Sequence, residues 1–299
     1  MNTVTPRPFD VAATTALARI PAACARRGPG WCAAAACILE ASAAKPGNVH
    51  PGADFADLSY DELVAAALAI APIMDRAAHE PLGRTIRDAV AASCRVTRSN
   101  ANLGMILAIA PLAAASAAGP AAVLAAASAR DAVDVWEAIR LARPGGLGAA
   151  TRWDVLGPAP PDIVEAMRLA APHDLVARLW AEDYAPLDAG PVRDLATELS
   201  RGTNLEDAII RTHLRQLARE PDSLIARRHG AAVAAEVSTR AAAALATGPE
   251  PSSLADFDRF LRSPRRLNPG TTADLVAAAL YILLRDHAPC PTLDFPTVP

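Results

Sequence analysis

Long runs rich in alanine and leucine most constrain the fold of this 299-residue chain. Alanine is the best helix former, and stretches such as "CAAAACILEASAA" at residues 32–44 hold little that favours another structure. Valine, isoleucine, tyrosine and phenylalanine do not gather in the alternating runs that are typical of strands. Hydrophobic residues make up 52% of the chain but aromatic residues only 4%, so helices must pack closely through small side chains. We therefore predict an all-α fold, a single compact domain of about ten to twelve helices.

The charge and cysteine pattern argues against several classes of protein. A net charge of -3 does not suit a nucleic-acid-binding protein, which would carry a basic stripe. The five cysteines form no CxxC pair and no zinc-ligand spacing, which indicates free thiols in a reducing compartment. No run of about 18 apolar residues and no signal-peptide pattern occurs. We therefore expect a cytoplasmic protein that neither binds nucleic acid nor spans a membrane.

Turn and capping residues divide the chain into helical segments. Proline and arginine are scattered over residues 1–28, which we expect to be partly ordered, and residues 289–299 should be a loose tail. Ser59 with Glu62, and Thr203 with Glu206, are capping boxes that open helices. The helices expected within the domain at 29–288 lie near 31–44, 59–78, 83–98, 101–117, 121–129, 131–142, 161–171, 174–183, 203–219, 221–246 and 254–262, with a last one ending near 285.

Four polar segments interrupt this apolar background, at residues 43–58, 98–105, 221–230 and 265–275. Most of them join a glycine or proline loop to a helix N-terminus. Such a terminus offers free N–H groups and a positive dipole end, so it suits phosphate. The first segment gathers Lys45, Asn48, His50 and Asp54 on backbone that cannot be helical, because Pro46 and Pro51 interrupt it.

The residue types in these segments suit work on a phosphorylated substrate. Lysine and arginine bind phosphate, and Asp54, Asp222 and Asp274 could hold Mg²⁺ or act as general bases. Each segment also has a simpler structural explanation, since Asp222, Asn100 and Asn102 are ordinary helix-capping residues. The "RPGGLG" loop at 143–148 matches neither the P-loop nor the dinucleotide fingerprint.

In order along the chain, the four segments resemble the motifs of the triphosphoribosyl-dephospho-CoA synthases, which are all-helical enzymes. Glu40, "AKPGNVH" and "GADF" are similar to a glutamate, "PKPGLVD" and "GAH-D" in that family. "NANLG" (100–104), "DSLIARRHG" (222–230) and "NPGTTADLV" (268–276) are similar to "NTHKG", "DTNLLHRGG" and "SPGGSADLL". The resemblance covers roughly residues 35–287.

Four positions depart from the family pattern inside the segments that carry it. His50 stands where the family has aspartate, and Asn102 and Leu103 replace a histidine and a lysine. Leu224 replaces an asparagine. The chain therefore resembles a divergent branch, in which the type of transfer can persist while the acceptor changes.

The resemblance implies a transferase that moves the triphosphoribosyl group of ATP to the ribose 2′-hydroxyl of 3′-dephospho-CoA and releases adenine. An oxocarbenium-like transition state then requires cations for phosphate, carboxylates for base work and amides for sugar hydroxyls. ATP and a dephospho-CoA-like acceptor are the expected partners, and Mg²⁺ is the expected cofactor. The candidate catalytic residues are Lys45, His50, Asp54 and Asp274; the candidate substrate-binding residues are Glu40, Asn48, Asn100, Asn102, Gly104, Arg228 and Asn268; the candidate Mg²⁺ ligands are Asp54 and Asp222.

Three alternatives stay open at this point. The same chemistry could serve another acceptor in a different cofactor pathway, for example one that makes a one-carbon pterin cofactor. The chain could be a non-catalytic nucleotide-binding protein, or a helical scaffold whose polar segments only cap helices. We expect Lys45, Asn100, Asp222 and Asp274 to converge on one cleft, and we expect the Lys45 side chain to bury little surface.

Overall fold

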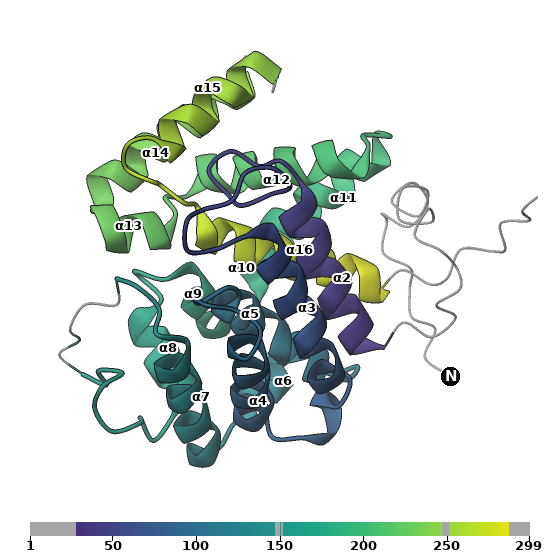
Figure 1. Ribbon diagram of the computed structural model, residues 1–299. Coiled ribbons are helices and arrows are strands. Elements are labelled where there is room, and N and C mark those ends of the chain that lie inside the picture. Colours follow the sequence, from purple (N-terminus) through teal and green to yellow (C-terminus); the bar gives the residue numbers. More distant parts are fainter. Residues whose placement is uncertain (1–27, 147–149, 151, 247–250, 287–299) are drawn as a thin grey trace, which may run out of the picture.

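The computed structural model describes residues 28–146, 150, 152–246 and 251–286, and within these it is all-α, as predicted (Figure 1). The described ranges contain no strand, only an isolated β-bridge between Phe55 and Leu58. The predicted order of residues 1–27 and 289–299 lies outside the described residues. The α-helices are α2 (Pro29–Ser42), α3 (Tyr60–Met74), α4 (Leu82–Cys94), α5 (Leu103–Ala114), α6 (Gly119–Ala125), α7 (Ala129–Ala142), α8 (Ile163–Ala170), α9 (Leu175–Ala181), α10 (Ala185–Leu187), α11 (Arg193–Ser200), α12 (Leu205–Arg219), α13 (Ser223–His229), α14 (Ala231–Ala246), α15 (Pro251–Arg262) and α16 (Gly270–Asp286).

Helix α16 is the centre of the fold. It is buried from Thr271 to Leu284 except at Asp274, and it packs against α2, α5 and α12. Helices α13, α14 and α15 lie on one side of it, and α4, α7 and α8 lie on the other (Figure 1). Alanines of α2, such as Ala33 and Ala36, are fully buried, so small side chains let these helices approach closely as the composition predicts.

Local capping explains where several helices begin. The capping box of Ser59 and Glu62 is confirmed, and a second box joins Ser128 to Asp131 at the start of α7. The predicted Thr203 box is wrong, because Asn204 is the N-cap of α12 and accepts the N–H of Asp207. These caps satisfy backbone N–H groups that a helix start leaves without partners.

The predicted long helix at 221–246 is also wrong. Gly230 has φ of 94° and divides it into α13 and α14. A residue with a side chain rarely adopts this left-handed region, so glycine ends α13 cleanly. This break, together with several short helices, makes the helices more numerous than the ten to twelve predicted.

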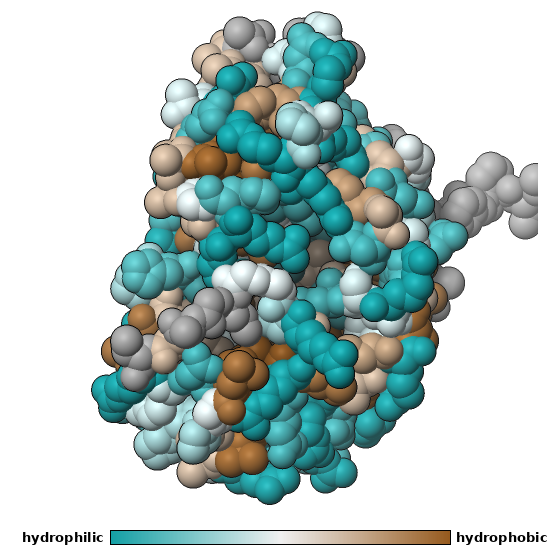
Figure 2. All heavy atoms as spheres, turned by 60° about the vertical axis from the view of Figure 1, so that its left-hand side comes forward, coloured by the Kyte–Doolittle hydropathy of each residue, from teal (hydrophilic) through white to brown (hydrophobic). Residues whose placement is uncertain are grey.

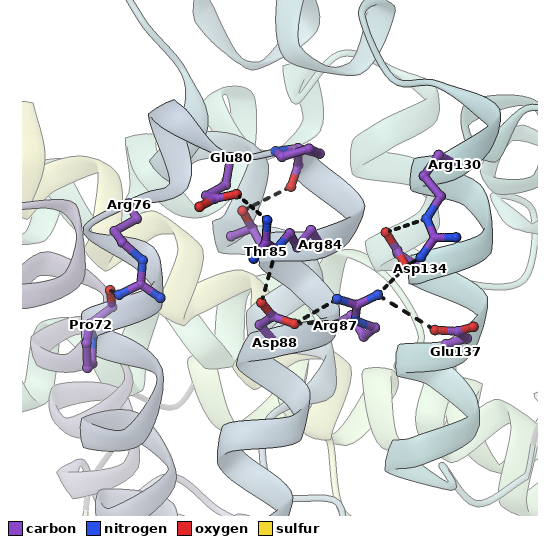
Figure 3. Close-up of polar contacts among 11 residues, drawn as sticks. Pro72, Arg76, Glu80, Arg84, Thr85, Arg87, Asp88, Arg130, Asp134 and Glu137 are labelled. Carbon is purple, nitrogen blue, oxygen red and sulfur yellow. Dashed lines mark hydrogen bonds and ion pairs between the residues drawn. The ribbon is translucent and has the colours of Figure 1, made fainter.

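A network of ion pairs joins the outer faces of α4 and α7 (Figure 3). Arg87 reaches Asp134 across the two helices at 2.5 Å, and Arg130 reaches the same carboxylate at 3.1 Å from one turn away. Asp134 is only 3% exposed, so this carboxylate fixes α7 against α4 rather than lying loosely on the surface. The network is distant from the cavity described below, since none of these three residues lines that cavity.

In the described residues, no single helix has the length and apolar composition to cross a membrane. Helices α5 and α6 pass the same test only as a pair bent by 100°. Helix α5 is a core helix, with Leu103 and every residue from Met105 to Ala113 buried.

Candidate active site

A cavity of about 510 Å³ lies between α5, α7 and α8 on one side and α13 and α16 on the other. Its size is within the usual range for a small-molecule site. The molecular face that carries α8 and α13 is largely hydrophilic, with smaller hydrophobic areas among the polar side chains (Figure 2). The cavity is lined by Asp57, Leu58, Ser99, Asn100, Leu103, Gly104, Leu107, Trp136, Ile139, Arg143, Pro144, Gly145, Ala150, Trp153, Asp154, Val155, Ala166, Met167, Ala170, Asp174, Val176, Ala177, Leu224, Arg227, Arg228, Arg266, Asn268, Thr271 and Asp274.

One part of the lining is apolar and contains two tryptophans. Trp136 of α7 is buried and donates its indole N–H to the carbonyl of Asp154 at 3.4 Å. Trp153 is half-buried, and the Arg152 guanidinium lies 3.9 Å from the centre of its ring. Ile139 and Met167 add aliphatic surface beside them. Flat aromatic and aliphatic walls of this kind suit a planar heterocycle such as a purine.

Four arginines add positive charge to the lining, namely Arg143, Arg227, Arg228 and Arg266. Arg227 is paired with Asp174 at 2.5 Å, and Arg266 is paired with Asp57. Arg143 and Arg228 have no ion pair with any described residue. A cavity that collects four cations and leaves two of them uncompensated is suited to a polyanion such as a triphosphate.

The loop after α7 brings Arg143 and Arg228 to the same wall. Arg143 ends α7 in the left-handed conformation, with φ of 48°. A Cβ built on Gly145 would lie 2.7 Å from the Arg228 guanidinium. The chain at Gly145 therefore passes close to the Arg228 side chain of α13, and Arg143, Pro144 and Gly145, which match no nucleotide-binding motif, form part of the cavity wall.

Asp274 is the carboxylate at the centre of the site. It lies on the first turns of α16 and is half-buried, yet it has no hydrogen bond or ion pair with any described residue. Burial raises the pKa of Asp274 well above the usual range of a carboxyl, and the neighbouring Glu40 and Asp222 raise it further. A carboxylate in this state is suited to accept a proton near neutral pH.

Gly104 allows α5 to start beside that carboxylate. A Cβ on Gly104 would lie 1.9 Å from Asp274 Oδ2, far closer than a non-bonded carbon and oxygen can approach. Asn100 accepts the N–H of Leu103 at 3.1 Å and so closes the first turn of α5. The N-termini of α5 and α16 thus meet at Asp274.

A smaller cavity of about 120 Å³, here called the annex, adjoins the main cavity. The two share Asn100, Gly104, Asn268 and Asp274 among their lining residues. Glu40, Asn48 and Asn102 line the annex but not the main cavity, whereas Leu103 and Leu224 line both. Asn102, Leu103 and Leu224 are three of the positions that depart from the family pattern.

Lys45 does not line either cavity, and the expectation that its side chain buries little is wrong. The side chain is 0% exposed, and Nζ lies 3.0 Å from Glu40 Oε1 and donates to the Ala43 carbonyl at 3.1 Å. Burial and the Lys45 charge lower the pKa of His213, which is therefore neutral in the same part of the core. Lys45 holds Glu40 in place rather than facing the main cavity.

Asp222 likewise belongs to the framework. Its Oδ1 caps α13 by accepting the N–H groups of Leu224 and Ile225, and its Oδ2 accepts the N–H and hydroxyl of Thr272 at 2.7 and 2.8 Å. Four hydrogen bonds occupy the lone pairs that a metal would need. Asp222 therefore joins α13 to α16 beneath the cavity.

Two predicted residues lie away from the cavities. His50 is half-buried, with Nδ1 3.1 Å from the Pro51 carbonyl, and Asp54 is exposed and accepts the Tyr60 N–H at 2.8 Å. Asp54 and Asp222 therefore do not fit a shared Mg²⁺ site. Elsewhere in the described ranges, no group of three or more His, Cys, Asp or Glu side chains could hold a metal.

The predicted residues thus divide into three sets. Arg228 lines the main cavity, while Asn100, Gly104, Asn268 and Asp274 line both cavities and Glu40, Asn48 and Asn102 line the annex. Lys45 and Asp222 support these walls from below, and His50 and Asp54 do not take part. Sequence reasoning missed Arg143, Arg227, Arg266, Trp136 and Trp153; the arginine pairs at 227–228 and 265–266 were a usable signal, whereas the tryptophans had none.

Comparisons with known proteins give a family match and a fold likeness. A family model described as ATP:dephospho-CoA triphosphoribosyl transferase matches residues 26–290. A solved structure from Archaeoglobus fulgidus, described as a "putative triphosphoribosyl-dephospho-coA synthase", is 21% identical and covers 75% of this chain and 98% of its own, with a TM-score of 0.58. That likeness shows that the two chains share a fold. No curated protein matches the chain.

Proposed function

Because this chain belongs to the ATP:dephospho-CoA triphosphoribosyl transferase family, we propose that its main cavity binds ATP and that Asp274 activates the acceptor alcohol. Membership of the family makes the chain a ribosyltransferase. The observation that carries the proposal is the unpaired Asp274 carboxylate, which lines the same cavity as the two tryptophans and the four arginines.

The two parts of the cavity correspond to the two ends of ATP. Trp136 and Trp153 provide flat surface for adenine, and Arg143 and Arg228 provide uncompensated charge for the triphosphate. Arg227 and Arg266 can add further hydrogen bonds while they remain paired with their aspartates. The ribose of the donor then lies between these ends, close to Asp274.

The transfer needs one bond to form and one to break. The acceptor oxygen attacks C1′ of the donor ribose while the bond from C1′ to the adenine nitrogen breaks. Asp274 takes the proton of the acceptor hydroxyl. Adenine leaves with the bonding electron pair and takes a proton from water, and Asp274 then returns its own proton to water. Asp274 is suited to this task because its raised pKa makes it a stronger base than an ordinary carboxylate.

Mg²⁺ remains part of the proposal as a partner of the nucleotide. Asp54 and Asp222 do not fit it, so the triphosphate oxygens and water would supply most of its ligands, with at most one carboxylate from the cavity. Bound there, the ion would neutralise part of the triphosphate charge.

The direct test incubates the purified protein with ATP, Mg²⁺ and 3′-dephospho-CoA and measures free adenine and the coupled product by mass spectrometry. Adenine together with product supports the proposal, and Asp274→Asn protein is the matched control. Adenine release with another alcohol but not with 3′-dephospho-CoA would show that the acceptor belongs to a different cofactor pathway. ATP binding without any adenine release would contradict a transferase role for the cavity.

The unpaired arginines give a first prediction. Arg143→Ala and Arg228→Ala should each raise KM for ATP by roughly 10- to 100-fold, because a hydrogen bond to a charged group contributes about 1.5–3 kcal/mol. Steady-state adenine release measures this. Arg259→Ala removes an arginine whose side chain is 74% exposed on α15, and it should leave KM unchanged. Equal effects of all three changes would show that overall charge, rather than the cavity, sets the affinity.

Gly104 gives a second prediction. Gly104→Ala should lower kcat/KM by at least about tenfold, because the new methyl group must push α5 or Asp274 aside and a misplaced catalytic group is costly. The assay is adenine release at saturating and limiting ATP. Gly157→Ala is the control, since its φ is not left-handed and a Cβ there would meet only the Asp154 carbonyl oxygen, at 3.3 Å. An active Gly104→Ala enzyme would mean that Asp274 is not held at this position during turnover.

A further inference from the structure

The annex contains two buried amides that are each half satisfied. Asn48 is 6% exposed and donates from Nδ2 to Asn268 Oδ1 at 2.8 Å, but its Oδ1 has no partner in the part of the chain that the structure describes. Asn102 is 4% exposed and accepts the Ser93 hydroxyl at 2.7 Å through Oδ1, but its Nδ2 likewise has no partner there. Leaving such groups unpaired costs stability, so both are suited to bind a ligand.

The unpaired atoms require a ligand with a particular pattern. Asn48 offers an acceptor and Asn102 offers a donor, and a hydroxyl group can serve either of them. The annex measures about 120 Å³, which is more than the roughly 30 Å³ share of one water molecule and less than the volume of a whole nucleotide site. Leu103 and Leu224 add apolar surface for carbon-bound hydrogens. A small polyhydroxylated ring meets all of these conditions.

We propose that the annex is the subsite for the pentose that is transferred, with Asn48 and Asn102 binding its hydroxyl groups. This inference rests on the proposed function and names the part of the donor that the annex recognises. It also gives Glu40 a role, because Glu40 and Asp274 both line the annex and interact electrostatically.

The two carboxylates fit the charge that develops on a transferred pentose. As the bond from C1′ to the base lengthens, positive charge builds on C1′ and the ring oxygen. Glu40 is held by its ion pair with Lys45 at 3.0 Å and supplies negative charge near C1′ and the ring oxygen. Asp274 takes the proton of the attacking hydroxyl. The electron pair of the broken bond leaves with adenine, which takes a proton from water, and Asp274 returns its proton to water, so charge and protons balance.

The test compares ATP with 2′-deoxyATP and 3′-deoxyATP as donors. The wild-type protein should prefer ATP over at least one of them by about 10- to 100-fold in kcat/KM, because buried polar groups lose their partners with the deoxy analogue. Asn48→Ala and Asn102→Ala should each reduce that preference by about 5- to 10-fold. Comparing ratios between variants cancels the different intrinsic reactivity of the deoxynucleotides.

Asn204→Ala is the matched control, since Asn204 caps α12 and does not line the annex. This variant should prefer ATP over the deoxynucleotides as strongly as the wild type does. Should Asn102→Ala fail to fold in a thermal melt, Asn102→Asp keeps the shape but replaces the donor with an acceptor, and the same loss is expected. Unchanged ratios in both variants, or altered KM for the acceptor alone, would overturn the proposal.

Calorimetric titration with the three nucleotides separates this inference from the proposed function. A wild-type protein that releases no adenine refutes the proposed function. If that protein still binds ATP more tightly than the deoxynucleotides and loses the difference in Asn102→Ala, the annex recognises a pentose. If it binds all three equally, the annex does not.

Discussion

Asp274→Asn should lower kcat/KM for triphosphoribosyl transfer by about 10²- to 10⁴-fold, the usual contribution of a general base. The amide keeps the shape of the side chain beside Gly104 but cannot accept the proton of the acceptor hydroxyl. ATP affinity should change little, because the arginines and the apolar wall remain. Adenine release and calorimetric titration on the same preparation measure the two effects.

The raised pKa of Asp274 sets the direction of two pH effects. Activity of the wild-type protein should rise with pH as Asp274 loses its proton, and the small residual activity of Asp274→Asn should lack this rise. Because the folded pKa lies above the unfolded one, the folded protein binds more protons between these two values, so stability falls as pH rises through that window. Asp274→Asn should therefore melt at the same or a higher temperature at pH 8. A variant that melts earlier yet keeps full activity would make Asp274 a structural residue.

Lys45→Ala should destabilise the protein by about 3–5 kcal/mol, because it leaves the buried Glu40 carboxylate without its cation. At this chain length the melting temperature should fall by roughly 6–20 °C. Arg84→Ala is the matched control, since it removes exposed ion pairs to Glu80 and Asp88 and should barely change the melt.

The double variant Lys45→Ala, Glu40→Gln separates the ion pair from packing. Removing both charges should recover part of the stability, because no unpaired buried carboxylate remains. A thermal melt of the four proteins gives the coupling free energy. Additive losses would show that Lys45 contributes through its hydrocarbon chain alone.

The fold was predictable because alanine-rich helices need little beyond local information. The capping box at Ser59 and the proline and glycine breaks are short sequence patterns, and they predict most of the helix boundaries. The break at Gly230 was missed because a single glycine within a helical pattern is often tolerated. Whether it ends a helix depends on how the following segment packs.

Sequence motifs predicted only some of the residues that line the candidate site. Asn100, Gly104, Asn268 and Asp274 lie at helix starts that tertiary packing brings together, as the motif order indicated. Lys45 was misjudged because its partner Glu40 lies across a helix end, where sequence spacing does not fix the direction of either side chain. Asp222 was misjudged because a helix cap and a metal ligand use the same side chain, and Thr272, which occupies its second oxygen, is 50 residues away.

Helix α16 carries Asp274 and is also the most central helix of the fold. During synthesis, α2, α5 and α13 leave the ribosome before α16 does, so α5 and α13 lack the helix that contacts both of them until α16 has been made. No partly folded chain that lacks α16 can then hold the donor nucleotide and the base together. Turnover in this protein should therefore appear in one step with the completed core, and a refolding experiment followed by activity should show a lag that tracks the burial of α16.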